Sequence, residues 1–202
     1  MSDTGTTKDT FRLERMILAG IGLAATVYLL PLIMPWTNIS WNDDWTQIFA
    51  FQSYLYDSIV HHGELPMRAH WLGSGFPIIA HPEYPVLSPL TATVLLLGPI
   101  AGTKMNVIVV TLVGVQGMWL CARNTLQMDV GPAIYGTLLF LLCGWLPAIL
   151  HSGNYPEIYF LWFPLLAYLV LREKVFDGAL VGAAILGAMM LLDGHLNSIC
   201  AF

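Results

Sequence analysis

The chain has 202 residues, of which 56% are hydrophobic and only 10% are charged. A soluble domain carries about 25% charged residues to cover its surface, so the composition excludes a soluble protein and indicates one embedded in a lipid bilayer. The net charge of −5 excludes a nucleic-acid partner, because no basic patch can neutralise phosphates. The three cysteines have neither paired spacing nor an even count, so they predict no disulfide framework and no zinc site.

The N-terminal region predicts a tail followed by a membrane span. Residues 1–15 are polar, and residues 16–35 carry no charge. At ~1.5 Å per residue, the second stretch covers about 30 Å as a helix, which is enough to cross the hydrocarbon core. A cleaved signal peptide has a shorter apolar region of roughly 7–15 residues, followed by small residues. We therefore expect residues 1–15 to form a cytoplasmic tail and residues 16–35 to form a retained first span.

The rest of the membrane bundle is predicted in residues 89–202. Four uncharged stretches predict further spans: 105–121, 132–150, 158–171 and 178–192. Residues 89–100 cover only about 18 Å as a helix, which favours a re-entrant or interfacial segment. No predicted span carries an ionisable residue in its interior, which argues against a proton-coupled transporter or an ion channel. Gly178 and Gly182 form a GxxxG pair that predicts close helix packing.

The basic residues decide between five and six spans, because they favour the cytoplasmic side. If residues 89–100 cross the membrane, the Lys and Arg residues divide four against four between the two sides. If they do not cross, six basic residues lie inside and only Arg68 and Lys104 lie outside. We therefore expect a single all-α domain with five spans, a short half-segment and a cytoplasmic N-terminus. This topology places most polar side chains in one extracytoplasmic loop, residues 37–88.

The outer loop begins with an acidic pair, Asp43 and Asp44, between two tryptophans. Apolar residues then recur at helical spacing and predict an amphipathic helix along the membrane surface: Ile48, Phe51, Leu55 and Ile59. Two interpretations of the pair stay open. In the first, Asp44 is the N-cap of this helix and Asp43 is a solvated neighbour. In the second, one of them accepts a proton from an acceptor hydroxyl or holds a divalent cation, Mg²⁺ or Mn²⁺, against a phosphate.

The remainder of the loop is dense in residues that form turns. Gly73 and Gly75 predict a fixed, non-helical path. His81 and Glu83, which lie among prolines, either bind a metal or form a hydrogen-bonded loop. Arg68 either holds a lipid phosphate or pairs with Glu64.

The order of these features resembles a known family. The resemblance rests on the acidic pair after the first span, on a glycine- and proline-rich loop, on Gly144 and His151 before a proline-containing span, and on a final Gly-His pair. The loop and the pair are Gly63…Leu65-Pro66…Trp71…Gly73…Gly75-Phe76-Pro77, then Pro85 and Pro89, and Gly194-His195. This order resembles the bacterial YfhO-like membrane proteins of the GT-C superfamily of glycosyltransferases.

The resemblance implies an enzyme of the bacterial inner, or plasma, membrane that uses a polyprenyl-phosphate-linked sugar at the extracytoplasmic face. The essential acidic residue of such enzymes maps onto Asp43 or Asp44. Arg68 would contact the donor phosphate, and the other substrate-binding residues would be His81, Glu83, His151, Glu157 and His195. GT-C proteins are generally longer, so a C-terminal companion segment or subunit is also expected. The alternatives are a non-catalytic membrane subunit or scaffold, and a transporter of lipid-linked substrates.

Overall fold

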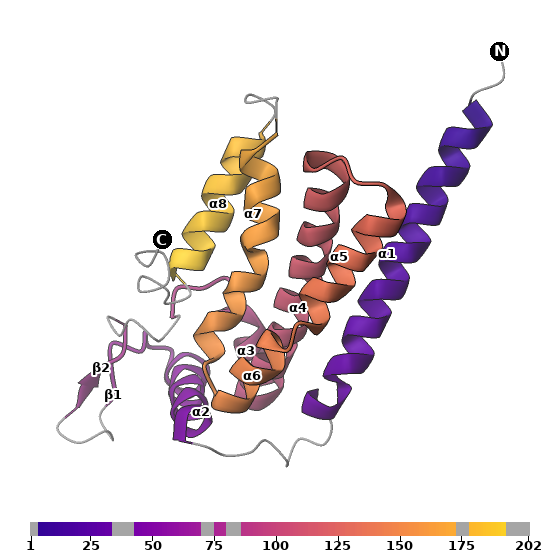
Figure 1. Ribbon diagram of the computed structural model, residues 1–202. Coiled ribbons are helices and arrows are strands. Elements are labelled where there is room, and N and C mark those ends of the chain that lie inside the picture. Colours follow the sequence, from indigo (N-terminus) through magenta and orange to yellow (C-terminus); the bar gives the residue numbers. More distant parts are fainter. Residues whose placement is uncertain (1–3, 34–42, 70–74, 80–85, 173–177, 193–202) are drawn as a thin grey trace.

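A computed structural model describes residues 4–33, 43–69, 75–79, 86–172 and 178–192 of the chain. Within these ranges the protein is mostly helical (Figure 1), which confirms the predicted all-α class. The strands among the described residues form one antiparallel pair, β1 (Arg68–Ala69) and β2 (Phe76–Pro77), in which Arg68 lies opposite Pro77.

Three helical segments are long and apolar enough to cross a membrane: Arg12–Leu30, Pro99–Thr125 and Val130–Ser152. The first lies within α1 (Thr4–Ile33), which begins inside the predicted tail 1–15. The second consists of α4 (Pro99–Leu120) and a π-helical turn, η2 (Cys121–Thr125). The third consists of α5 (Val130–Leu142) and α6 (Trp145–Ser152), which are separated at Gly144, where φ is +80°. The chain therefore has the helices of a membrane protein.

Two shorter apolar segments follow, and 3₁₀ geometry lengthens one of them. A 3₁₀ helix, η3 (Tyr155–Trp162), continues directly into α7 (Phe163–Val170), and α8 (Ala179–Leu192) comes last. Because a 3₁₀ helix rises ~2.0 Å per residue, η3 and α7 together reach about 28 Å, against about 24 Å for an α-helix of equal length. The apolar helix in the region of the predicted span 158–171 therefore begins earlier, at Tyr155, and in a different conformation.

Helix α4 lies at the centre of the bundle because glycines let its neighbours approach closely. A Cβ atom at Gly114 would lie 2.6 Å from the carbonyl oxygen of Leu161, and one at Gly117 would lie 2.7 Å from the backbone nitrogen of Leu165. The prediction that Gly178 and Gly182 allow close helix packing is wrong. Gly178 precedes α8 with a φ of +78°, and a Cβ at Gly182 would meet its nearest neighbour at an ordinary 3.7 Å.

The outward faces of α1, α5 and α8 expose large apolar side chains. Leu23 is 67% exposed, Tyr135 is 70% exposed and Val181 is 63% exposed. Water-soluble proteins rarely expose apolar surface this extensively, whereas lipid covers it without cost. The exposed apolar surface and the helix lengths therefore both indicate a lipid bilayer.

The bundle has two ends that are built from different elements. The N-terminal part of α1, the connection between α4 and α5, and the start of α8 lie at one end (Figure 1), which we call the basic end. Its described side chains include four arginines, Arg12, Arg15, Arg123 and Arg172. An ion pair of 2.5 Å between Arg123 and Glu14 joins η2 to α1 there. We call the opposite end, where α2 and α6 lie, the loop end.

The loop end is built from α2 (Asp43–Tyr56), a π-helical turn η1 (Asp57–His61), the strand pair and α3 (Thr91–Leu97). The predicted apolar face of α2 is present, and Phe51 and Leu55 are 5% and 1% exposed. These side chains pack against Ala69, Ile78 and Val94 of the hairpin region and α3. Protein therefore covers the face that the sequence assigned to the membrane surface, because the chain after α2 folds back over it.

Lys104 corrects the prediction that no span has an ionisable residue in its interior. The sequence places this lysine in a loop before a span that starts at residue 105. The helix instead begins at Pro99, a residue favoured at the first helical position, and Lys104 lies in its second turn with 4% of its surface exposed. Its position is about 8 Å from the start of the helix, and a long lysine side chain can bury its stem there.

Candidate functional site

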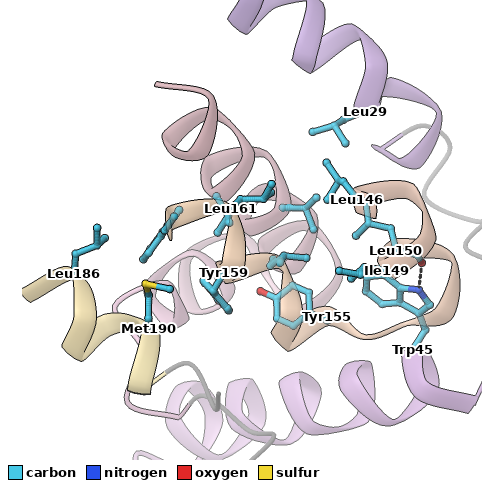
Figure 2. Packing of buried hydrophobic residues seen from close by; sticks show 14 of the residues in the cluster. Leu29, Trp45, Leu146, Ile149, Leu150, Tyr155, Tyr159, Leu161, Leu186 and Met190 are labelled. Atoms are coloured by element: carbon cyan, nitrogen blue, oxygen red, sulfur yellow. Dashed lines mark hydrogen bonds between the residues drawn. The ribbon is translucent and has the colours of Figure 1, made fainter. Parts of the chain in front are cut away.

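A hydrogen bond between two distant segments fixes the start of α2. The indole Nε1 of Trp45 donates to the carbonyl oxygen of Leu150 in α6 at 2.7 Å (Figure 2). The Trp45 ring is 3% exposed, stacks on Phe49 at a centroid distance of 5.5 Å and lies 6.2 Å from the ring of Tyr155. The first turn of α2 is therefore held against the end of α6 and the start of η3.

This contact joins segments that carry three of the predicted site residues. Asp44 precedes Trp45 and is exposed, and His151 follows Leu150 and is also exposed. Glu157 is half-buried in the first turn of η3. Asp44, His151 and Glu157 thus lie within one or two residues along the chain of Trp45, Leu150 and Tyr155, where α2, α6 and η3 meet.

The position of Asp44 differs from the N-cap interpretation. Helix α2 already begins at Asp43, so Asp44 is its second residue, and the N-cap position precedes the described range. A carboxylate in the first turn still interacts favourably with the positive end of the helix dipole. Asp44 is therefore suited to the helix without a capping hydrogen bond.

Arg68 lies at the other end of α2. The hydroxyl of Tyr54 donates to the backbone carbonyl of Arg68, and Tyr54 is about 15 Å along the helix from Asp44. The Arg68 guanidinium covers Gly75, where φ is +93° and a Cβ atom would lie 2.2 Å from Nε. The positive φ agrees with the fixed path predicted for this loop, but the fold does not bring the backbone of Arg68 to the acidic pair.

Four other predicted site positions lie outside the described residues: the side chain of Asp43, and the residues His81, Glu83 and His195. Their roles stay predictions.

Sequence reasoning missed a cluster at the end of α2. The Nδ1 atom of His61 lies 2.8 Å from Oδ1 of Asp57, and Nδ1 of His62 lies 3.1 Å from the Asp57 carbonyl oxygen. The spacing of four residues between Asp57 and His61 was the available signal, since such residues share a helix face. The described side chains contain no group of three or more His, Cys, Asp or Glu residues that could hold a metal ion.

Comparison with known proteins adds no relative. No family model, curated protein or solved structure matches the chain. The resemblance to YfhO-like proteins therefore remains an expectation from the sequence.

Proposed function

We propose that the chain is the membrane part of a glycosyltransferase that moves a sugar from a polyprenyl-phosphate donor to an acceptor at the loop end. The observation that supports this most directly is the hydrogen bond from Trp45 to Leu150, which holds the acidic start of α2 beside α6. A catalytic carboxylate must keep its position relative to both substrates, and a buried clamp next to it supplies that constraint.

In the proposed reaction, Asp43 or Asp44 acts as the general base. The carboxylate accepts the proton of the acceptor hydroxyl as its oxygen bonds to the anomeric carbon of the sugar. The bond between that carbon and the phosphate oxygen breaks, and polyprenyl phosphate leaves with the electron pair. His151 and Glu157, which belong to the segments that pack against the start of α2, are suited to hydrogen bonds with sugar hydroxyls.

The location of the reaction follows from the proposed topology. We propose five crossings, with the basic end in the cytoplasm of a bacterium and the loop end outside. The four arginines at the basic end support this orientation, because basic residues favour the cytoplasmic side. The exposed apolar faces would accommodate the polyprenyl chain within the bilayer, while its phosphate and sugar lie at the loop end.

The described side chains contain no group of three or more metal ligands. Mg²⁺ or Mn²⁺ would instead be held by Asp43 or Asp44 together with the donor phosphate. Sugar-transfer assays with added Mg²⁺ and with a chelator test directly whether the reaction needs a metal ion.

The experiment compares transfer by the wild type with transfer by Asp43→Asn and Asp44→Asn, in membranes that keep any companion subunit. Replacing the working carboxylate should reduce transfer by roughly 10²-fold or more. Asp57→Asn is the matched control, since Asp57 is an exposed carboxylate at the other end of α2. Wild-type rates in both test variants would reject the mechanism. A wild type that releases no polyprenyl phosphate would reject the enzyme in favour of a scaffold or a transporter.

A further inference from the structure

A buried amide joins three separate elements inside the bundle. Asn106 of α4 is 2% exposed. Its Nδ2 donates to the hydroxyl oxygen of Tyr155 at 3.0 Å and to the carbonyl oxygen of Leu90 at 3.3 Å. The hydroxyl of Thr93 in α3 donates to its Oδ1. Both amide hydrogens and the amide oxygen are therefore used, and they connect α3, α4 and η3.

Tyr155 continues this connection to the candidate site. It is the first residue of η3 and is 1% exposed. Its hydroxyl accepts from Asn106, while its ring lies 6.2 Å from the ring of Trp45. Trp45 in turn is bound to Leu150 and directly follows Asp44. An unbroken series of contacts thus runs from the middle of the bundle to the acidic start of α2.

The polar character of this series is informative. Apolar side chains of similar volume would fill the same space without the cost of burying an amide and two hydroxyls. Buried hydrogen bonds differ from apolar contacts in their direction, because each donor must meet its acceptor at a defined distance and angle. The network therefore fixes where the ring of Tyr155 lies, and with it the surface on which Trp45 rests.

We propose that Asn106 and Tyr155 are positioning residues for the acidic start of α2. They touch no substrate, because both are buried, and they act through Trp45. This inference rests on the proposed function for its catalytic consequence. Its structural consequence, a fixed distance between the first turn of α2 and the start of η3, can be measured without any activity.

The first measurement uses spin labels at Gln47 and Asn154, two exposed positions beside the contact between Trp45 and Tyr155. The labels are attached to cysteines in a background in which Cys121, Cys143 and Cys200 are serines. Asn106→Leu and Tyr155→Phe should broaden or shift the distance distribution between the labels. The matched control is Thr111→Val, because the buried hydroxyl of Thr111 binds only Val107 of its own helix among the hydrogen bonds described.

The second measurement is sugar transfer by the same variants without labels. Tyr155→Phe should lower kcat while the KM for the donor stays within twofold of the wild type, since a displaced base slows the chemical step without removing a donor contact. If Asn106→Leu fails to fold, Tyr155→Phe and Thr93→Val test the positioning role instead, because each removes only a single hydroxyl.

The two measurements separate this inference from the function on which it rests. Wild-type distance distributions in Asn106→Leu and Tyr155→Phe, or equal broadening in Thr111→Val, would overturn the positioning role. A wild type without transfer would reject the proposed function, while the distances would still support or overturn the network. A changed distance with unchanged kcat would overturn the catalytic consequence.

Discussion

The indole of Trp45 donates its hydrogen bond to the carbonyl of Leu150 across 105 residues of sequence. Both residues are buried in the cluster drawn in Figure 2, at 3% and 6% exposure. This hydrogen bond satisfies both partners. The buried indole N–H gains an acceptor. The carbonyl of Leu150, in the last turn of α6, has no partner within its helix and gains a donor.

Trp45→Phe should therefore destabilise the protein by about 1–3 kcal/mol, since the aromatic ring is kept but a buried acceptor loses its donor. Equilibrium unfolding in mixed micelles measures the difference. Trp145→Phe is the control, because this half-buried tryptophan packs against Phe160 at the rim of the same cluster. Equal losses in the two variants would contradict a special role for the bond to Leu150.

A second prediction concerns Gly75 and the side chain of Arg68. Gly75→Ala must adopt a φ of +93°, so it should cost about 1–2 kcal/mol. An added Cβ would lie 2.2 Å from Nε of Arg68, but this exposed, flexible side chain can move away, so the contact should add little. Gly63→Ala isolates the conformational cost, because Gly63 has a φ of +67° and an added Cβ would meet nothing within 4 Å.

A double variant tests the contact itself. In an Arg68→Ala background, Gly75→Ala should cost as much as it does in the wild type, because moving the guanidinium contributes little. A cost that falls markedly without the arginine would show that this contact, not the backbone conformation, determines the effect.

The order of the helices was largely predictable from the sequence, because long uncharged stretches carry a strong signal. Their boundaries were less predictable. Lys104 suggested a loop, yet a lysine can lie inside a helix near its end when its long stem is buried. Gly144 interrupts a continuous apolar stretch, since a left-handed glycine ends a helix whatever the hydropathy around it.

The contacts of the site were not predictable from spacing alone. Asp44 was identifiable as a candidate, but its neighbour Trp45 carried no sign of a distant partner. The partner of that indole, Leu150, is an apolar residue that binds through its backbone, and a sequence pattern carries no signal for such a contact. Asn106 did not stand out in the sequence, because its partners come from α3 and η3.

A third prediction concerns the glycines of α4. Gly114→Ala should destabilise the bundle by about 1–3 kcal/mol, because the added methyl group overlaps the Leu161 carbonyl oxygen at 2.6 Å. Gly187→Ala in α8 is the control, since an added Cβ there meets nothing within 4 Å and alanine favours a helix by roughly 0.5–1 kcal/mol. The two variants should thus change the unfolding free energy in opposite directions, and stabilisation by both would disprove the close packing of α4.

The last prediction tests the topology on which the proposed reaction depends. Glu64 lies at the loop end and Asn124 at the basic end, and both are exposed. Single cysteines at these positions, in a background without the native cysteines, are treated in intact cells with a maleimide that cannot cross the membrane. Because α4 and η2 together are about 40 Å long, their two ends should lie on opposite sides of a core that is about 30 Å thick. We expect Glu64→Cys to react from outside, and Asn124→Cys to react only after the cells are permeabilised. Labelling of Asn124→Cys from outside would place the basic end outside the cell, and the proposed use of a donor at the extracytoplasmic face would then fail.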